Sequence, residues 1–459
     1  MSIESIQVDL PPSLNPEQIK ILPLANSISE GNLLTATKIA TAYNIPPGNG
    51  LGVKVGIISL GGGFSQADLN KSMANLGLTT GNVTFVGVDG ATNNYTGNVY
   101  SADGENALDL VCVAGMVPSA NIVLYKAGGV TGVYYDPNPS TAANLNSNNS
   151  FANTIQRAVD DNCDVITISW GYTEKRISGG ITYYVGDFLA GPLANAAAKN
   201  ISVFVAAGDY GSQAQQGDLT YQIVSTDYPS VNANVTAVGG TYLTLDAGNT
   251  WVSETVYNNS VAGYPTGFGG GGGVSSMVGL PVYQANLTYK TYPDNVVHSL
   301  TYRGIPDISA AMNAYGVWIG NTVVELAGTS ASAPIMAGTV ARFISLNGGR
   351  RPPNGSAGLN SIFYNHTGGF RDIATGNNAS LLANGYASTT SWDATTGLGP
   401  QSNATATYQA VASAGVAIKN SGNTWAPVAN VYVKTGVSTW ANVQHIWTKT
   451  SANTWSQTY

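Results

Sequence analysis

The stretch VKVGIISLGGGFSQADLNKSMANLGLTTGNVTFVGV, residues 53–88, holds two apolar runs with a helix-like segment between them. The runs at 53–60 and 83–88 have the length and the Val and Ile content of buried parallel strands, and residues 65–77 have a helical pattern. The alternation continues with strand-like runs at 121–127, 163–170 and 201–208 and helix-like segments at 105–118 and 186–200. This order predicts an α/β fold: a doubly wound, mostly parallel sheet with helices on both faces and functional residues at the carboxyl ends of its strands.

Composition narrows the class of protein. Of 459 residues, 43% are hydrophobic and only 9% are charged, which is enough apolar volume for a large core and excludes global disorder. The net charge of −7 and the absence of a basic run argue against a nucleic-acid partner and against an anionic-membrane anchor. No run of about 18 apolar residues is present, so we expect no membrane span. We expect protein or small-molecule partners, and buried free thiols at Cys112 and Cys163.

A candidate nucleophile lies in LAGTSASAPIMAG, residues 326–338. Here Ser330 stands at the start of a small-residue helix pattern, where the helix N-terminus and neighbouring amides favour an attacking oxygen and a developing oxyanion. The alternative is an ordinary capping serine. A serine nucleophile needs a base, and none of His298, His366 and His445 lies in a strand-end context beside a carboxylate.

Carboxylates offer another base. Glu105 and Asp109 are four residues apart, on one face of the helix predicted at 105–118, where two close carboxylates readily share one proton. A solvated acidic helix start is the plainer interpretation. In VFVAAGDYGS, Asp209 follows an apolar strand, and in its protonated form it can donate a hydrogen bond to an oxyanion; alternatively it is an ordinary turn aspartate.

Taken together, these strings resemble the sedolisins, serine-carboxyl peptidases whose fold is similar to that of subtilisin. The resemblance covers about residues 34–400 and implies an endopeptidase that acts on proteins at acidic pH. It implies Ser330 as nucleophile, Glu105 as general base, Asp109 as its support and Asp209 as oxyanion donor. The matching strings, in order, are GENALDLVCVAG, TISWG, VAAGDYGS, GGGGGVSSMVGLPVYQ, RGIPDISA and AGTSASAPIMAG.

The run of five glycines within the fourth string, residues 269–273, suits neither a helix nor a strand, so we expect the backbone there to approach another segment closely or to move.

The resemblance also implies one Ca²⁺ near the end of this region, held by oxygen ligands as calcium prefers. Asp372 and Asp393 match its two aspartates, and the carbonyls of Ile373, Thr389 and Ser391 match its backbone ligands. The family usually has glycines at the last two positions, so coordination here requires other residues to adopt the necessary backbone angles. The alternative is a pair of loop aspartates that make turn hydrogen bonds.

Two further departures stand out. Some members carry a glutamate that extends the carboxylate network where this chain has Ser59, while the tryptophan of that network is retained as Trp170. Family precursors usually carry a long N-terminal prodomain, but only about 33 residues precede the match. We therefore expect a mature form or a chain that folds unaided.

The last residues form an internal repeat. Aligning NTWAPVANVYVKTGV with STWANVQHIWTKTSA and NTWSQTY superposes Trp425, Trp440 and Trp455 at a period of 15 residues. The pattern predicts a β-hairpin or meander, whose aromatic residues either face a partner or pack on one another. It resembles short repeats at the ends of phage virion proteins, which implies attachment to a structural partner and an extracellular or virion-associated location.

These observations predict three regions: an N-terminal extension at 1–33, a peptidase domain at 34–402, and a linker with the repeat tail at 403–459. The rival hypothesis is a catalytically silent structural or adhesion protein that keeps the peptidase fold as a scaffold. Retention of four polar residues in one predicted cleft favours the enzyme.

Overall fold

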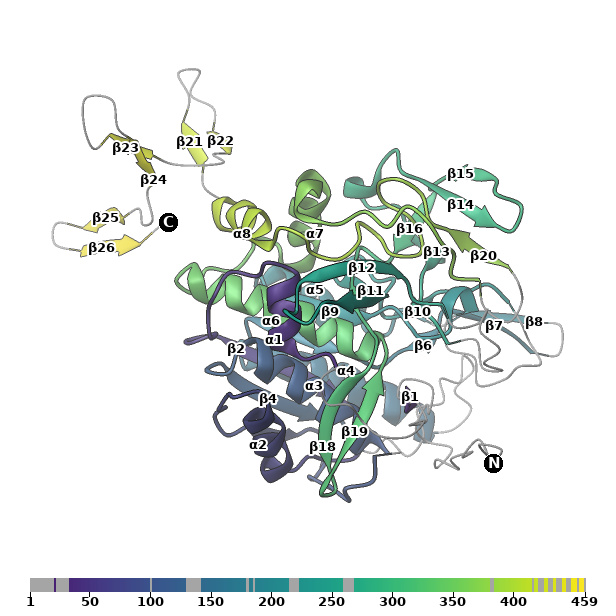
Figure 1. The fold of residues 1–459 in the computed structure, drawn as a ribbon, viewed down its shortest axis with the longest axis horizontal. Coiled ribbons are helices and arrows are strands. Elements are labelled where there is room, and N and C mark those ends of the chain that lie inside the picture. The colour runs from purple at the N-terminus through teal and green to yellow at the C-terminus, as the bar shows by residue number, and fades with distance from the viewer. Residues whose placement is uncertain are drawn as a thin grey trace.

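A computed structural model describes residues 20–21, 33–99, 101–128, 142–178, 181–184, 186–213, 223–258, 268–379 and 384–414, together with six short strands between 417 and 457 (Figure 1). His445 lies outside the described residues.

The centre of the molecule is an eight-stranded sheet in the order β12-β11-β9-β5-β2-β4-β3, with β17 also paired to β11. Every neighbouring pair is parallel except β11 with β12. The predicted doubly wound, mostly parallel sheet is therefore confirmed. Its strands are β2 (Lys54–Ser59), β3 (Thr84–Gly87), β4 (Asn121–Lys126), β5 (Val165–Ile168), β9 (Ser202–Ala206), β11 (Thr236–Leu245), β12 (Trp251–Val256) and β17 (Ile308–Ala311).

Helices cover both faces of this sheet, because successive strand residues point to opposite sides. In β2, Ile57 joins the apolar cluster that includes residues of α3 and α6, while Ile58 joins the cluster that includes residues of α4 and α5. Two further helices, α7 and α8, follow α6. The helices are α1 (Ala36–Ala42), α2 (Gln66–Asn75), α3 (Ala102–Met116), α4 (Ala142–Asp160), α5 (Ala190–Ala198), α6 (Thr329–Leu346), α7 (Gly355–Asn365) and α8 (Ala404–Ser413).

Helices α3 and α6 lie against each other with their N-terminal ends together. Close contact is possible because Gly338 of α6 has no side chain: a Cβ there would lie 2.6 Å from the Cβ of Met116 at the end of α3. Arg342, one turn further along α6, donates from Nε to the Met116 carbonyl at 3.0 Å, which satisfies a terminal acceptor of α3. The first turns of both helices therefore meet at the same end of the sheet.

Smaller sheets surround this core. The hairpin β18–β19 leads into α6, and β1 pairs antiparallel with the end of β19. The strands of these sheets are β1 (Lys20–Ile21), β6 (Tyr172–Thr173), β7 (Lys175–Ser178), β8 (Ile181–Tyr184), β10 (Asp227–Tyr228), β13 (Gly273–Gly279), β14 (Thr288–Tyr292), β15 (Val297–Ser299), β16 (Tyr302–Ile305), β18 (Tyr315–Ile319), β19 (Thr322–Ala327) and β20 (Gly385–Ala387).

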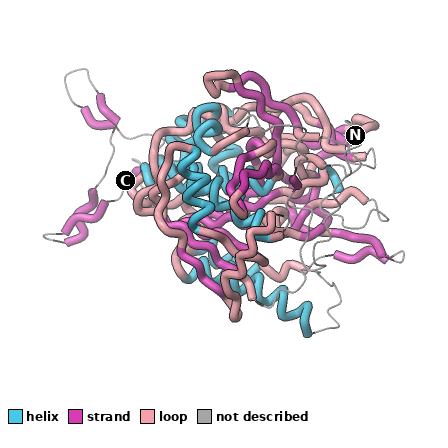
Figure 2. Tube along the Cα trace, turned by 60° about the horizontal axis from the view of Figure 1, so that its bottom comes forward, coloured by secondary structure: helices cyan, strands magenta, loops and turns pink. Residues whose placement is uncertain are grey.

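The repeat tail consists of three two-stranded hairpins that Figures 1 and 2 draw beyond α8. Each pairs a lysine with the tryptophan six residues later: Lys419 with Trp425, Lys434 with Trp440, and Lys449 with Trp455. The predicted β-structure is confirmed, with one more strand than the aligned repeats contained, because Ala417–Lys419 also pairs. The strands are β21 (Ala417–Lys419), β22 (Trp425–Pro427), β23 (Tyr432–Lys434), β24 (Trp440–Asn442), β25 (Trp447–Ser451) and β26 (Thr454–Gln457).

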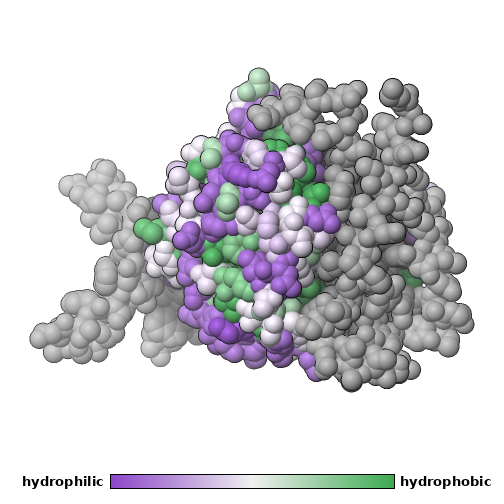
Figure 3. Space-filling model, turned by 90° about the horizontal axis from the view of Figure 1, so that it is seen from below, coloured by the Kyte–Doolittle hydropathy of each residue, from purple (hydrophilic) through white to green (hydrophobic). Residues whose placement is uncertain are grey.

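Helix α8 packs on the body through Tyr408, whose ring centre lies 5.6 Å from that of Phe343 in α6. Both cysteines are buried free thiols, as predicted. Among the described residues, no helix combines the length and the apolarity that a bilayer crossing requires. On the face drawn in Figure 3, hydrophobic residues lie in small groups between hydrophilic ones.

Candidate active site

Ser330 lies in the first turn of α6, directly after the strand β19. The turn between them is made by Gly328, whose φ of 146° is a conformation that side chains disfavour. Ser330 is 1% exposed and stands at the helix end where unpaired backbone N–H groups concentrate positive potential. The local sequence therefore places the hydroxyl in the anion-favouring position that was predicted for it.

Glu105 and Asp109 lie one turn apart on α3, and both are fully buried. Burial raises the pKa of each carboxyl well above its ordinary value, and the neighbouring Asp109 raises the pKa of Glu105 further. The Ser330 hydroxyl acts in the opposite direction on the pKa of Glu105, as a hydrogen-bond donor to that carboxylate. Neither oxygen of Glu105 meets the length and angle of a full hydrogen bond with a described residue, so its contact with the Ser330 hydroxyl falls short of ideal geometry.

The start of α3 is fixed by another acidic residue, Asp103. Its Oδ1 accepts from the Gly63 amide at 2.7 Å, and its Oδ2 accepts from the amides of Thr96 and Gly97 at 2.7 and 3.0 Å. The Ser101 hydroxyl caps the helix by accepting from the Asp103 amide at 3.2 Å. These bonds tie two loops to the first turn of α3 and hold Glu105 in place.

Ser169 is a site residue to which the sequence analysis gave no role. It follows β5, and its hydroxyl donates to Asp109 Oδ1 at 2.7 Å, while the Ser330 carbonyl lies 3.4 Å away. It therefore connects the carboxylate pair to the first turn of α6. Its position at the carboxyl end of a central parallel strand was the available signal.

Asp209 follows β9 and is also bound to α6. Its Oδ1 accepts from the Thr329 amide at 2.8 Å and from the Thr329 hydroxyl at 2.7 Å. Asp209 also raises the pKa of Glu105 through its charge, although less than burial and Asp109 do. The structure thus brings Ser330, the Glu105/Asp109 pair and Asp209 together from three segments that are distant in sequence, and it adds Thr329 as the residue that orients Asp209.

Neither described histidine belongs to this group. His298 stacks on Tyr289, with ring centres 5.1 Å apart, and His366 is exposed with Nδ1 2.9 Å from the Ile362 carbonyl. At the position where some relatives have a glutamate, the Ser59 hydroxyl donates to the Gly61 carbonyl at 2.9 Å. The buried Trp170 indole N–H has no partner among the described residues.

The glycine run at 269–273 passes through a slot lined by backbone. The Gly269 amide donates to the Asp209 carbonyl at 2.8 Å, and the Gly271 amide donates to the Gly208 carbonyl at 2.7 Å. A Cβ at Gly271 would lie 2.1 Å from the Ala207 carbonyl oxygen. Of the two expectations for this run, close approach is the one observed, and it lies against the Asp209 loop.

Comparison with known proteins agrees with this arrangement. A sequence model described as the subtilase family matches residues 88–357, more than half of the chain. The chain belongs to the subtilase family. Kumamolisin from Bacillus sp. (strain MN-32) is 35% identical over 377 residues, which cover 80% of this chain and 61% of kumamolisin. Tripeptidyl-peptidase SED1 from Arthroderma otae is 24% identical, with 80% of this chain and 62% of the relative covered.

A solved structure shows the same fold. Pseudomonas sedolisin, a serine-carboxyl proteinase in complex with pseudo-iodotyrostatin, superposes with a TM-score of 0.64 at 24% identity, covering 82% of this chain and 97% of sedolisin. The predicted subtilisin-like fold and the predicted resemblance to sedolisins are therefore confirmed. The chain spans about three fifths of the length of kumamolisin and of tripeptidyl-peptidase SED1.

The predicted calcium residues also lie close together in this subtilase. Asp372 Oδ2 accepts from the Ser391 amide at 3.0 Å, and Asp393 Oδ2 accepts from the Thr389 amide at 3.1 Å. Ser391 adopts a φ of 69°, the left-handed conformation that a glycine would adopt more easily, whereas Thr389 does not. Burial raises the pKa of Asp393 to about 6.

These residues present oxygen donors only, and Asp393 Oδ1 already accepts turn hydrogen bonds from the amides of Thr395 and Thr396 at 2.9 and 2.8 Å. The carbonyls of Ile373, Thr389 and Ser391 accept no hydrogen bond from any described residue, and Asp372 retains a second oxygen that is not engaged there. Oxygen-only donors of this kind match calcium. No group of three or more His, Cys, Asp or Glu side chains with metal-binding geometry occurs among the described residues, so any such site depends on backbone carbonyls.

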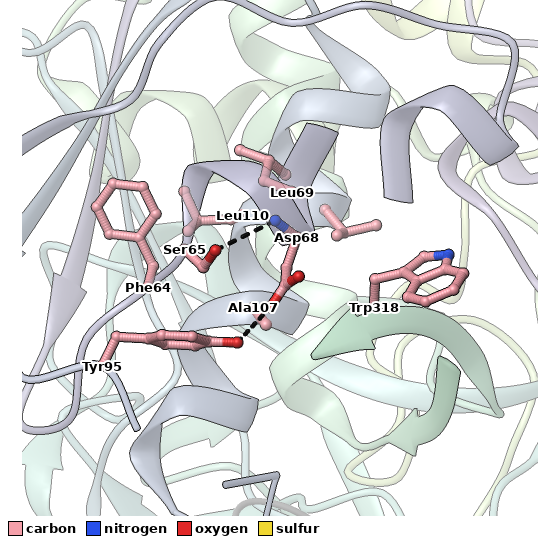
Figure 4. A pocket seen from close by; sticks show the side chains of 9 residues that line it. Phe64, Ser65, Asp68, Leu69, Tyr95, Ala107, Leu110 and Trp318 are labelled. Carbon is pink, nitrogen blue, oxygen red and sulfur yellow. Dashed lines mark hydrogen bonds between the residues drawn. The ribbon is translucent and has the colours of Figure 1, made fainter. Parts of the chain in front are cut away.

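A small pocket lies on a different face of α3 (Figure 4). Its polar group, Asp68, is already satisfied by the Tyr95 hydroxyl, the Gly320 amide and the Lys71 ammonium. Neither carboxylate of the buried pair reaches this pocket, so it is not the candidate active site. Its lining residues are Phe64, Ser65, Asp68, Leu69, Tyr95, Ala107, Leu110, Val111 and Trp318.

The buried pair makes a prediction about stability. Because the pKa values of Glu105 and Asp109 are raised by folding, the folded state binds protons more tightly than the unfolded chain. Their contribution to stability is fully present below their ordinary pKa values and is lost as pH rises through the raised ones. We expect the midpoint temperature of thermal unfolding to decrease as the pH is raised from about 4 to about 7. The decrease should be smaller in Asp109→Asn.

The matched control for this prediction is Asp160→Asn, which removes a carboxylate whose side chain is 58% exposed. This variant should follow the wild-type dependence. An equal decline in Asp109→Asn and in the wild type would show that burial of the pair does not govern acid stability.

Proposed function

We propose that this subtilase is a serine-carboxyl endopeptidase that hydrolyses peptide bonds of proteins at acidic pH. One observation carries the proposal: Ser330 shares a buried site with three carboxyl groups, and neither described histidine lies there. The similarity to kumamolisin and to sedolisin supports the same chemistry. A catalytically silent scaffold has no physical need to bury these carboxyl groups beside a serine, because burying them costs stability.

In the proposed mechanism, ionised Glu105 accepts the proton of Ser330 as Oγ attacks the substrate carbonyl carbon. The new C–O bond moves the carbonyl π electrons onto oxygen, and protonated Asp209 donates a hydrogen bond to that oxyanion. Glu105 then gives its proton to the leaving amine, the C–N bond breaks, and an acyl-serine remains. A water molecule then attacks the acyl carbon while Glu105 takes its proton. The C–O bond to Ser330 breaks, Glu105 returns the proton to Oγ, and the acid product leaves.

Neighbouring residues prepare these groups for their roles. Asp109 lies beside Glu105 and raises its pKa, so that Glu105 accepts a proton more readily than an exposed carboxylate would. Ser169 holds Asp109 by its hydrogen bond to Oδ1. The amide and the hydroxyl of Thr329 both donate to Asp209 Oδ1, and in the proposed mechanism Oδ2 carries the donating proton.

We expect a bell-shaped dependence of kcat/KM on pH, centred on the acid side. Activity requires Asp209 protonated and Glu105 ionised, so it falls toward neutral pH as Asp209 loses its proton and falls at more acidic pH as the Glu105/Asp109 pair, whose pKa values burial raises, becomes protonated. Cleavage of an internally quenched peptide with a blocked N-terminus, measured from about pH 2 to about pH 8, tests this dependence and also distinguishes an endopeptidase from a tripeptidyl-peptidase.

The control for this assay is Ser330→Ala, which should lower kcat by at least about a thousandfold. A rate that rises through neutral pH would contradict the carboxyl mechanism. Equal inactivity of folded wild type and Ser330→Ala on blocked and free peptides would favour the scaffold hypothesis.

We also propose that one Ca²⁺ binds to Asp372 and Asp393 together with the carbonyls of Ile373, Thr389 and Ser391. The unengaged carbonyls and the raised pKa of the buried Asp393 support this assignment. When bound, the ion would supply positive charge that stabilises the ionised Asp393 and would hold the loop that contains it. The ion has no part in the peptide-bond chemistry.

If this assignment is correct, free Ca²⁺ at about a hundred times its dissociation constant adds about 2.7 kcal/mol to stability. The shift in thermal midpoint should be larger at neutral pH than in acid, because Asp393 becomes protonated as pH falls through about 6. Asp393→Asn should abolish most of the shift, whereas Asp246→Asn, at an exposed turn, should retain it. An unchanged calcium shift in Asp393→Asn would refute the assignment.

We propose a division of the chain into an N-terminal extension, a peptidase domain from about residue 34, and a tail of hairpins that attaches the enzyme to a structural partner of a virion or other extracellular assembly. Packing of α8 on α6 favours a boundary after Ser413 rather than at residue 402. The Lys–Trp pair that recurs in all three hairpins supports a repeated binding unit.

Removal of residues 415–459 tests the proposed tail function. The shortened chain should cleave the quenched peptide with unchanged kcat/KM, because none of the described tail strands supplies a residue to the site. It should no longer sediment with purified virions or with the cell-envelope fraction of the source. Equal recovery of the full and shortened chains in both pellets would argue against attachment through the tail.

A further inference from the structure

Glu174, which follows β6, is a buried carboxylate to which the mechanism gives no role. It is 0% exposed, and among the described residues no cation pairs with it. Four neutral donors surround it instead. The hydroxyls of Thr226 and Ser275 donate at 2.5 Å each, and the amides of Ser276 and Met277 donate at 3.0 and 3.2 Å. A carboxylate is suited to this position because it only accepts.

The first structural connection from Glu174 to Asp209 is the glycine run at residues 269–273. Ser275, Ser276 and Met277 belong to β13, which begins at Gly273, the last residue of that run. At its other end the run donates to the carbonyls of Gly208 and Asp209. The carboxylate of Glu174 therefore holds one end of a segment whose other end holds the Asp209 backbone.

The second connection runs through β10. Thr226 donates its hydroxyl to Glu174 Oε2, and its carbonyl accepts from the Glu174 amide at 2.7 Å. The next residue, Asp227, has its carboxylate packed against Gly208, where a Cβ would lie 2.0 Å from Asp227 Oδ2. Both connections from Glu174 therefore end at the Gly208–Asp209 turn.

We propose that Glu174 is a positioning residue for the oxyanion donor: by gathering donors from β13 and from Thr226, directly before β10, it fixes the turn that aims Asp209. The inference rests on the proposed role of Asp209. Glu174→Gln tests it, because the amide places an NH₂ donor among four donors and leaves at least one of them without an acceptor. The glycine run has no side chains of its own to compensate for that loss.

The first measurement is kinetic. In Glu174→Gln, kcat should fall about tenfold while KM changes less than about twofold, because a misplaced donor weakens transition-state binding more than substrate binding. A peptide aldehyde, which forms a hemiacetal oxyanion with the nucleophile, should lose affinity by the same factor. The matched peptide alcohol, which forms no oxyanion, should bind as it does to the wild type. Ser275→Ala removes only one donor to Glu174, so its kcat and its aldehyde affinity should lie between those of the wild type and those of Glu174→Gln.

The matched control is Glu254→Gln. Glu254, in β12, is another buried glutamate outside the catalytic group, and it is bound by Tyr43, Thr241 and Arg371. Its neutralisation should lower the thermal midpoint while leaving kcat and aldehyde affinity unchanged. Equal kinetic losses in both variants would mean that Glu174 acts only through general stability.

The second measurement does not depend on activity. Hydrogen exchange followed by mass spectrometry should show faster exchange at residues 206–210 and 268–274 in Glu174→Gln, and at neither segment in Glu254→Gln. Unchanged exchange at 206–210 would overturn the proposed positioning even if the enzyme proved inactive. Faster exchange together with unchanged aldehyde affinity would show that Glu174 positions the turn but that Asp209 is not the oxyanion donor.

Discussion

The burial of Glu105 and Asp109 side by side on α3 is the constraint on which the rest of this structure depends. Two carboxylates without a cation are costly inside a protein, and the cost is reduced only if protons or directed dipoles are supplied. Here the parallel arrangement of α3 and α6 brings both helix N-termini to the pair, and Ser169 donates a hydrogen bond to one member. The close contact at Gly338 that permits this arrangement is therefore as much a part of the site as the acidic residues.

A second constraint is that the site is assembled from backbone as well as side chains. Gly328 turns the chain into α6, and the glycine run at 269–273 lies against the loop of Asp209, where any side chain would collide with a carbonyl. Buried carboxylates hold other backbone segments around the site: Asp103, at the start of α3, accepts from the Gly63 amide, and Glu174 accepts from the Ser276 amide just after the glycine run. A chain with only 9% charged residues thus places several of its few carboxylates inside, as fixed acceptors.

Much of this was predictable from sequence because it depends on local pattern. The strands of the central sheet follow from short apolar runs, and Ser330, Glu105, Asp109 and Asp209 follow from ordered motifs. Ser169 and Glu174 were missed for a different reason: their importance lies in partners about 50 to 160 residues away, and even the strand-end position of Ser169 does not indicate which residues it contacts. The first hairpin strand was missed because Ala417–Lys419 lacks the aromatic residues that mark its counterparts.

The tail hairpins differ from the body in that their pairing repeats at a fixed interval of sequence. When equal binding units are linked in one chain, the overall binding affinity increases with the number of units. Each added unit binds at the high effective concentration that its tethered neighbours set. Gain or loss of 15 residues would change the valency of such a tail by one without disturbing any contact in the sheet. The proposed attachment and the proposed catalysis therefore depend on separate parts of this chain and are open to selection independently of each other.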